Sequence, residues 1–296
     1  MFKKNSSKKN KKLAFSLIEL SIVILVIGIL TVGVNQGYNL VRSAQISNAR
    51  SITAKSPILQ LSGLMAWYET SLKESLNQSN IVDGNSLTAW KDISPNSILN
   101  GANQLTPSTV SSAITYLQSS INKIPAIKFN GSSKLSIANL SQGASSQATV
   151  FLVIKLNYTP NSTDYKTIFD GNSATFSFSI KSDAVQINMG DATPISTTYS
   201  TGFSNAGEYV IAVYFNGSNS KVFINNTTSA ISTSDIASTG TNQLAGITIG
   251  ANRSGANGFA GFISEVAIFN RVIKSTERKE IFNYFSKKYK IDITGV

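Results

Sequence analysis

Residues 11–34 read KKLAFSLIELSIVILVIGILTVGV, and this stretch decides how the chain is organised. The twenty residues from Phe15 to Val34 carry one charge, Glu19, and they follow a leader, residues 1–14, that holds six lysines and no acid. An α-helix of that length rises about 30 Å, which matches the hydrocarbon core of a membrane. The sequence therefore predicts a membrane-spanning helix whose lysine-rich leader stays on the cytoplasmic side.

Three interpretations of this stretch are open. A cleaved secretory signal needs a small-residue site after its apolar run, and the residues after Ile29, TVGVNQGYNL, contain no such pattern. A plain membrane anchor gives no reason for the acid at Glu19, because placing a carboxylate in the bilayer costs about 2.5–3.5 kcal/mol of insertion free energy. A cut between Ala14 and Phe15 would create an α-amino group four residues before Glu19. In packed copies, the carboxylate of one subunit could then neutralise the terminal amine of its neighbour.

The segment KKLAFSLIELSIVILVIGIL resembles the N-terminal processing and methylation signal of type IV prepilins and the related pseudopilins. The resemblance implies that a prepilin peptidase cuts after Ala14, that Phe15 is then N-methylated, and that Glu19 guides assembly with other pilin or pseudopilin subunits. The usual residue before the cut is glycine, so Ala14 departs from the pattern. The resemblance also implies a bacterial inner membrane location before assembly, with a periplasmic C-terminal domain that later reaches the pilus, the cell surface or the exterior.

The charge and composition exclude several classes of function. Of the 26 basic side chains six lie in the leader, which leaves 20 against 15 acidic ones, an ordinary surface balance. We therefore do not expect nucleic acid as a partner, and DNA capture by a competence pilus would rest on this modest balance alone. The sequence has no cysteine and no histidine, which excludes disulfides, thiol nucleophiles, Ser-His-Asp triads and zinc sites built from those ligands.

The residues after the apolar stretch divide the chain into domains. From Asn35 to Lys55 apolar residues recur at helical spacing without proline, which predicts that the membrane helix continues as an amphipathic stalk. A flexible linker is the alternative, because the segment contains glycine, serine and asparagine. We expect a leader at residues 1–14, a transmembrane and stalk helix at 15–55, a linker at 56–62 and a globular domain at 63–296.

The globular domain is predicted to be mainly β. Apolar residues alternate with polar ones on both sides of Lys181–Asp183, which indicates a hairpin, and near-continuous apolar runs indicate strands covered on both faces. An apolar stripe after Ser275, taken as the N-cap, predicts a C-terminal helix at residues 276–288. We expect an antiparallel jelly-roll sandwich with a C-terminal α-helix, carried on the long N-terminal helix. The expected strands are residues 149–156, 176–180, 185–189, 209–215, 221–225, 247–249 and 262–269.

A second set of motifs is similar to the concanavalin A-like lectin/glucanase, or laminin-G-like, jelly-roll domain. The motifs are GLMAWY at 63–68, WKDISPN at 90–96, PAIKFNG at 125–131, IGA at 249–251, GFISEV at 261–266 and Glu277-Arg278. They are mostly structural, so they identify a fold better than an activity.

The glucanases of that fold allow a test for catalytic residues. Retaining glucanases of this architecture resemble one another in a Glu-x-Asp-x-(x)-Glu strand whose carboxyls lie about 5–5.5 Å apart. The sequence has no such run, and Glu265 stands alone on its expected strand. We therefore expect that the protein is not an enzyme and has no catalytic residues, and that Glu265 is a structural carboxylate bonded to a nearby loop.

Lectins of this fold usually hold sugar with loop Asn and Asp side chains, an aromatic platform and often Ca²⁺, whose oxygen ligands require no histidine or cysteine. Ca²⁺ is therefore the one cofactor that the resemblance suggests, with no metal ligands specified. The segment Asp170-Gly171-Asn172 also fits a simple β-turn. We expect Trp67 and Trp90 in core or edge packing. The candidate ligand-binding residues are Tyr165, Asp170, Asn172, Asn252 and Arg253.

These observations predict a minor pilin or pseudopilin-like subunit of a type IV pilus or type II secretion system, which displays a lectin-like domain outside. Its head would contact a glycan, a secreted protein or another subunit, and its size favours a low-copy or tip position. The alternative is a membrane-anchored surface adhesin or carbohydrate-binding protein that does not assemble into a filament.

Overall fold

The computed structural model describes residues 16–77, 81–95, 97, 103–108, 114–232, 236 and 238–296. Ala14 and Phe15, the predicted cleavage and methylation residues, lie outside this set. The chain forms two units, Met1–Ala44 and Gln45–Val296.

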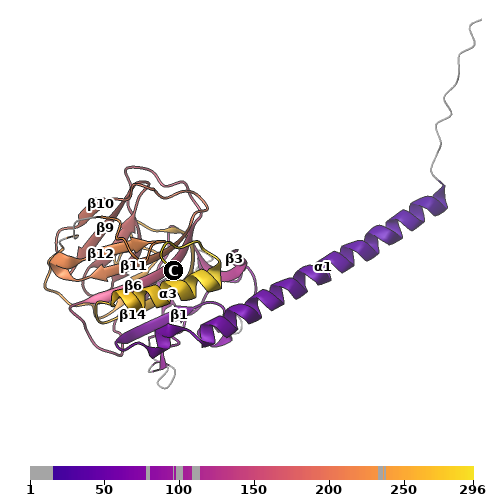
Figure 1. The fold of residues 1–296 in the computed structure, drawn as a ribbon. Helices are drawn as coiled ribbons and strands as arrows, with labels where there is room; N and C mark the ends of the chain where they lie inside the picture. The colour runs from indigo at the N-terminus through magenta and orange to yellow at the C-terminus, as the bar shows by residue number, and fades with distance from the viewer. Residues whose placement is uncertain are drawn as a thin grey trace, which may run out of the picture. The chain divides into compact units, whose positions relative to one another are not determined.

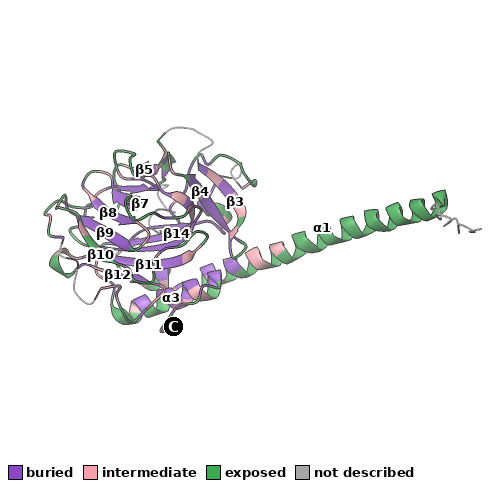
Figure 2. Cartoon of the chain, turned by 90° about the horizontal axis from the view of Figure 1, so that it is seen from above, coloured by how far each residue is buried: buried purple, intermediate pink, exposed green. Residues whose placement is uncertain are grey.

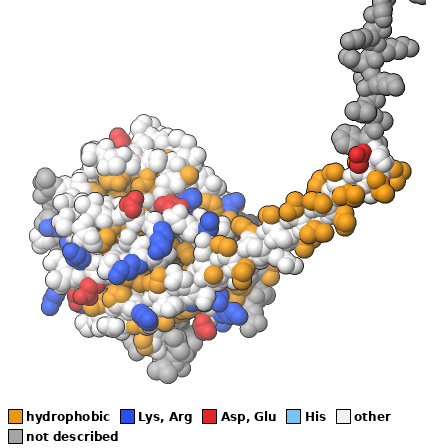
Figure 3. Space-filling view, turned by 45° about the vertical axis from the view of Figure 1, so that its right-hand side comes forward, with side chains coloured by type: hydrophobic (Ala, Val, Ile, Leu, Met, Phe, Trp, Pro, Cys, Tyr) orange, Lys and Arg blue, Asp and Glu red, His pale blue; other side chains and the backbone are white. Residues whose placement is uncertain are grey.

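The first unit contains most of helix α1, which begins at Leu17 and ends at Ala54. The absence of proline lets the helix continue past the apolar run, as the stalk pattern predicts, and Pro57 follows its end. Large apolar side chains between Leu17 and Val34 are exposed along the helix (Figure 3). This part of α1 is long and apolar enough to serve as a membrane anchor or a signal sequence.

The second unit is an antiparallel sandwich of two seven-stranded sheets (Figure 1). The helix-covered sheet has the order β12-β11-β6-β14-β4-β3, with β1 also paired to β14, and the open sheet has the order β10-β9-β8-β7-β13-β5-β2. Strands of the helix-covered sheet are β1 (Leu64–Glu69), β3 (Ile114–Ile121), β4 (Ile124–Asn130), β6 (Ala148–Leu156), β11 (Glu208–Phe215), β12 (Lys221–Ile224) and β14 (Ala260–Phe269). Strands of the open sheet are β2 (Thr106–Pro107), β5 (Leu135–Ile137), β7 (Lys166–Gly171), β8 (Phe176–Ile180), β9 (Ala184–Met189), β10 (Ile195–Thr198) and β13 (Ile247–Ile249).

The strand predictions are confirmed, together with the fold class. The predicted hairpin is β8 and β9, in which Phe176 pairs with Met189 and Ile180 with Val185. The continuous apolar runs are β6 and β11, the neighbouring strands inside the helix-covered sheet. Short single-turn helices are η1 (Pro57–Gln60), between α1 and β1, and η2 (Lys73–Ser75) and η4 (Gly217–Asn219), between strands.

Two hydrophobic cores explain why β6 is apolar on both faces. Val150 and Leu152 point into the core between the sheets, whereas Phe151 points into a second core beneath helix α3 (Ser275–Tyr289). Figure 1 shows α3 lying across the outer face of the helix-covered sheet, and Figure 2 shows that the strands are largely buried. Phe151 packs edge-on against Phe282 of α3, with ring centroids 6.0 Å apart. Such aromatic pairs contribute about 0.5–1.5 kcal/mol beyond the area that they bury.

The start of α3 differs by one residue from the sequence prediction. Lys274, rather than Ser275, occupies the N-cap position, and no side-chain oxygen of residue 275 caps the helix. Glu277 supplies the cap instead, because its carboxylate accepts the Lys274 backbone N–H at 2.8 Å while it pairs with Arg271. Trp67 and Trp90 are buried in the cores, as predicted.

Candidate functional site

Asp170 belongs to the segment for which a β-turn was the alternative, and the structure places the bend only from Asn172 onward. Asp170 and Gly171 end strand β7, where Asp170 pairs with Thr248 of β13. The carboxylate is buried and accepts the backbone N–H groups of Phe176 at 3.1 Å and Arg253 at 2.9 Å. Burial raises the pKa of Asp170 to about 6, although these hydrogen bonds oppose the shift.

Arg253 connects Asp170 to a second carboxylate, that of Asp191. The guanidinium Nη1 lies 3.0 Å from Asp191 Oδ1, and Asp191 also accepts hydrogen bonds from Thr175 and Asn242. The hydrogen bond from the Thr175 hydroxyl is the main reason why the pKa of Asp191 falls to about 2. Asp170, Asp191 and Arg253 are called the Arg253 cluster below, and Asp191 was not predicted from the sequence.

The other three predicted ligand residues differ in position. Asn172 lies beside the Arg253 cluster, where its Oδ1 accepts the Thr248 hydroxyl at 3.3 Å. Asn252 bonds within its own turn, since its Oδ1 accepts Ser254 Oγ and the Ala256 N–H, each at 2.8 Å. The ammonium nitrogen of Lys181 lies 5.3 Å from the centroid of the Tyr165 ring. Among the described residues, no hydrogen bond or ring contact joins Tyr165 to the Arg253 cluster. The structure thus brings together Asp170, Asn172 and Arg253 and leaves Tyr165 apart.

The carboxylate oxygens of the Arg253 cluster are occupied by Arg253 and by neighbouring donors. Both Asp170 oxygens and both Asp191 oxygens accept hydrogen bonds. Within the described residues, no three acidic side chains converge as a metal ion would require. Ca²⁺ binding stays a prediction without a matching donor set among these residues, because Ca²⁺ needs six to eight oxygen ligands.

An open hollow of about 570 Å³ lies elsewhere on the sandwich, and we call it the Tyr199 hollow. Its walls are the loop between β10 and β11, the segment after β12 and the C-terminal tail. The tail is fixed there because the Thr294 N–H donates to Asn225 O and the Thr227 N–H donates to Thr294 O, each at 2.9 Å. The volume falls within the range typical of small-molecule sites.

Three aromatic residues that are largely buried in the core, Tyr199, Phe203 and Tyr209, line one side of the Tyr199 hollow. The ring centroids of Tyr199 and Phe203 are 4.8 Å apart, and those of Phe203 and Tyr209 are 5.0 Å apart. The loop reverses at Gly202, whose φ of +72° is a left-handed conformation that glycine adopts without strain. The Phe203 N–H donates to Ser182 O at 2.7 Å, which fixes the loop against the β8–β9 turn.

Polar groups form the rim of the hollow. Ser200, Ser229 and Asp292 line it and are exposed, and Asn226 is half-buried. Asp292 has no hydrogen-bond or ion-pair partner in the part of the chain that the structure describes. Asn226 Oδ1 already accepts hydrogen bonds from Thr228 and Ser229, so the groups that the hollow offers to a ligand are the Asp292 carboxylate, the serine hydroxyls and the Asn226 side-chain nitrogen.

None of these hollow-lining residues was predicted from the sequence. The segment YSTGFS at residues 199–204 did offer a signal, because two aromatic residues flank a glycine in a polar loop. The segments at 225–231 and 292–294 carry no comparable signal. Their convergence depends on how the tail returns to the end of β12.

Glu265 is the one acidic residue of β14, as the sequence indicates, but the neighbouring strand β1 places a second carboxylate beside it. It lies directly opposite Glu69 of β1 in the antiparallel register, and both side chains are fully buried. Its carboxylate is structural, as expected, but its partners are Trp67 on β1 and three side chains of α3 rather than a nearby loop. The sequence could not reveal these partners, because β1 and β14 are almost 200 residues apart.

A sequence model of the concanavalin A-like lectin/glucanases superfamily matches residues 129–277, half of the chain. No curated protein matches the chain in sequence.

Solved structures share the fold at low sequence identity. Trypanosoma rangeli sialidase in complex with the inhibitor DANA is 13% identical, with a TM-score of 0.52, and the match covers 76% of this chain and 33% of the sialidase. The binding domain of Paraclostridial Mosquitocidal Protein 1 is 15% identical, with a TM-score of 0.53, over 75% of this chain and 52% of that one. The chain thus spans about a third of the length of the sialidase.

The prediction that the protein is not an enzyme requires correction. The sialidase contains the same fold, and so does a Trypanosoma rangeli sialidase mutant displaying trans-sialidase activity. The mutant is 12% identical to this chain, with a TM-score of 0.52, and the match covers 84% of this chain and 38% of the mutant. The lack of a glucanase-type run of carboxylates in the sequence therefore does not exclude a glycosidase. What the likeness shows for this chain is the fold.

Proposed function

We propose that this chain, which belongs to the concanavalin A-like lectin/glucanase superfamily, binds a glycan in the Tyr199 hollow. The observation that carries the proposal is the pairing of an aromatic wall with an open polar rim in a hollow of about 570 Å³. The volume suits a short saccharide rather than a long polymer chain.

The chemistry of the hollow suits a sugar. One face of a pyranose ring is a row of C–H groups, which packs on an aromatic surface such as that of Tyr199 or Phe203. The hydroxyl groups at the edge of the sugar need hydrogen-bond partners, which Asp292, Asn226 and Ser229 offer at the rim. The exposed carboxylate of Asp292 suits a neutral sugar, because it would repel a negatively charged one.

The first experiment is a glycan array with the full chain in detergent micelles, with and without Ca²⁺, followed by calorimetric titration of any glycan that binds. Asp292→Asn is expected to weaken binding about tenfold, since a hydrogen bond to a charged group contributes about 1.5–3 kcal/mol. Glu74→Gln is the control, because Glu74 is exposed and lies outside the hollow. Equal affinity in the wild type and Asp292→Asn would contradict the proposed site.

We further propose that the N-terminal helix makes the chain a prepilin-like subunit, cut after Ala14 by a prepilin peptidase and methylated at Phe15. Glu19 supports this proposal, because it lies exposed in the first turn of α1 and accepts the Ser16 N–H at 2.8 Å. An acid in that turn is favoured by the helix dipole, and it is available to the terminal amine of a neighbouring subunit.

In this proposal the protein is a minor pilin or pseudopilin of a type IV pilus or type II secretion system, and its head carries a glycan or a secreted protein. It would occupy the inner membrane before assembly and the pilus or cell surface afterwards. Shearing of filaments, followed by quantification of their subunits, tests the minor role. A finding that this chain is the most abundant subunit would contradict it.

A further inference from the structure

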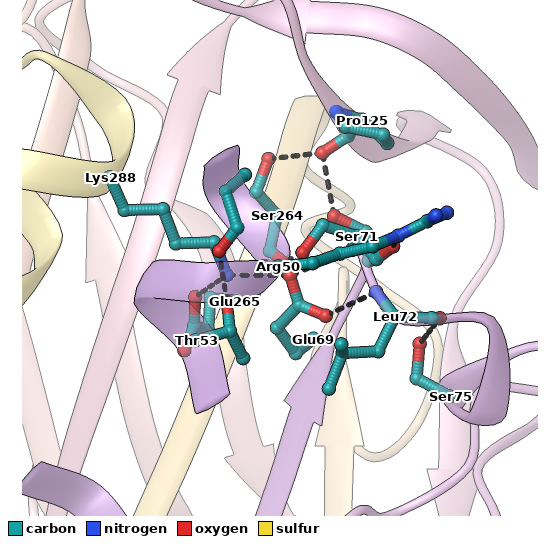
Figure 4. A network of polar contacts seen from close by, with 12 residues as sticks. Arg50, Thr53, Glu69, Ser71, Leu72, Ser75, Pro125, Ser264, Glu265 and Lys288 are labelled. Carbon is teal, nitrogen blue, oxygen red and sulfur yellow. Dashed lines mark hydrogen bonds and ion pairs between the residues drawn. The ribbon is translucent and has the colours of Figure 1, made fainter. Parts of the chain in front are cut away.

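Glu69, Glu265 and Lys288 form a buried group, which we call the Lys288 cluster. The ammonium nitrogen of Lys288 lies 2.5 Å from Glu69 Oε1 and 2.8 Å from Glu265 Oε2, and all three side chains are 0% exposed. They come from β1, β14 and α3, and Figure 4 shows them pointing toward one another. One amine is therefore held against two carboxyl groups, out of contact with bulk solvent.

The cluster carries one carboxylate more than its single ammonium can neutralise. Buried charges are costly unless they are paired, and ionised groups in such a site exchange protons to become neutral. Burial raises the pKa of Glu265, and the neighbouring carboxylate of Glu69 adds to that shift. The amine and the two carboxyl groups are thus held within reacting distance of one another, away from bulk solvent.

Glu69 is held as an acyl group ready for attack. Its Oε1 accepts the Ser71 N–H and its Oε2 accepts the Leu72 N–H, both at 2.7 Å. Arg50 fixes this segment, because its Nε donates to Ser71 O at 2.8 Å. Backbone N–H groups aimed at a carboxyl group stabilise the negative charge that develops on oxygen when a nucleophile adds to the carbon.

Glu265 is held differently, as a group that carries a proton. Its Oε1 accepts Trp67 Nε1–H at 2.7 Å and the Tyr284 hydroxyl at 2.8 Å, while its Oε2 accepts the Tyr289 hydroxyl at 2.8 Å. No backbone N–H donates to it among the described residues, in contrast to Glu69. Its Oε2 contacts the same Lys288 nitrogen that contacts Glu69 Oε1, so Glu265 can take a proton directly from that nitrogen.

We propose that Lys288 Nζ and Glu69 Cδ form an amide bond within the folded chain, with release of one water molecule and with Glu265 as the proton carrier. The ammonium of Lys288 first gives one proton to the Glu69 carboxylate, which leaves a neutral amine beside a neutral acid. The Nζ lone pair then forms the bond to Cδ, and the C=O π electrons move onto Oε2, which stays on the Leu72 N–H.

Glu265 completes the step. Its carboxylate takes a second proton from the attacking nitrogen and returns it to the Glu69 Oε1 hydroxyl, which leaves as water while the carbonyl re-forms. One C–N bond forms, one C–O bond breaks, and no oxidant or other reagent is needed. The fixed geometry replaces an encounter between separate reactants, an advantage that corresponds to effective concentrations of about 10⁵–10⁸ M.

The bond would join residues 219 positions apart in the sequence and fasten β1 to the C-terminal helix. Strand β1 is the first strand after α1, so any pulling force that enters through the N-terminal helix reaches β1 first. A covalent link at Glu69, the last residue of β1, would stop unfolding under such a force at that residue and pass the force to α3. The chain has no cysteine, so a disulfide cannot provide this link.

Mass spectrometry of the full chain, purified in detergent, denatured and digested with trypsin, tests the proposal. Trypsin cleaves after Lys55 and Lys73, and also after Lys287 and Lys290. The expected product is residues 56–73 joined to residues 288–290, one water molecule lighter than the two peptides together, with fragment ions that place the link at Glu69 and Lys288. The unlinked 56–73 peptide should be largely lost.

Three outcomes would overturn parts of the proposal. Complete recovery of unlinked residues 56–73 excludes the bond, and a link from residues 254–271 to Lys288 assigns it to Glu265 instead of Glu69. Lys288→Arg keeps the charge but is expected to abolish the link. Glu265→Gln, with folding checked by circular dichroism, is expected to return the unlinked peptide, and a link that persists in it excludes Glu265 as the proton carrier.

Discussion

The Lys288 cluster and the Tyr199 hollow are both polar, but they differ in access to solvent. In the Lys288 cluster the three side chains are 0% exposed, and their polar atoms bond to one another and to neighbouring buried donors. In the hollow, Ser200 and Asp292 are exposed, and Asp292 has no partner among the described residues. Complete internal pairing fits a structural or self-reactive group, whereas unused hydrogen-bonding capacity fits a binding site.

The Arg253 cluster shows the same contrast on a smaller scale. Asp170 and Asp191 both contact Arg253, yet burial raises the pKa of Asp170 to about 6 and hydrogen bonding lowers that of the more exposed Asp191 to about 2. The number of neighbouring charges therefore does not decide the proton affinity of a carboxyl group. Burial and the donors around it do.

Lys288→Met is expected to have the largest effect, because it removes the nitrogen that contacts both Glu69 and Glu265, together with the proposed amide bond, and leaves two buried carboxyl groups without that partner. Breaking a buried ion pair in this way costs about 3–5 kcal/mol in the free energy of unfolding. Denaturant unfolding of the full chain in detergent measures it. Lys287→Met is the control, since Lys287 is exposed and should change stability by less than about 0.5 kcal/mol. Equal losses in the two variants would remove the contrast between buried and exposed charge.

The pH dependence of stability tests the buried carboxylate of Asp170. Because its folded pKa of about 6 lies above the ordinary value of 3.8, the folded state binds more protons between these pH values. The free energy of unfolding should therefore fall as the pH rises from about 4 to 6, by up to about 3 kcal/mol from this group. Asp170→Asn should have a shallower dependence over that range, and an unchanged slope would show that Asp170 titrates normally.

Glu19→Ala should have the smallest effect on the head, since Glu19 belongs to the first unit and the hollow to the second. The unfolding midpoint and glycan affinity should match those of the wild type, while filament incorporation is lost. Co-purification with sheared filaments measures incorporation. If the variant still enters filaments, the prepilin-like role of Glu19 is contradicted; if the wild type never enters them, the adhesin without a filament gains support.

The strands could be predicted because each one carries its own signal. The alternation around Lys181–Asp183 fixes both β8 and β9, and the two cores make β6 and β11 apolar on both faces. The N-cap of α3 was misplaced by one residue because Glu277 caps the helix from within, so that Ser275 is not needed.

The polar sites could not be predicted, because their members come from distant parts of the chain. Glu265 appears isolated in the sequence, and only the pairing of β1 with β14 sets Glu69 opposite it. Lys288 looks like an ordinary basic residue in the last turn of a helix until α3 is packed on the sheet. Of the predicted ligand residues, Asp170 and Arg253 do meet, but the Asp191 that joins them was not identified.

The central claim, that the Tyr199 hollow binds a glycan, is tested most directly by filling it. Ser229 is exposed and lines the hollow, so Ser229→Trp should block the space and leave the unfolding midpoint unchanged. Calorimetric titration should show at least tenfold weaker glycan binding by Ser229→Trp, and wild-type affinity for Lys73→Trp, which changes an exposed residue outside the hollow. Equal glycan binding by the wild type and Ser229→Trp, or no glycan binding by the wild type, would contradict the claim.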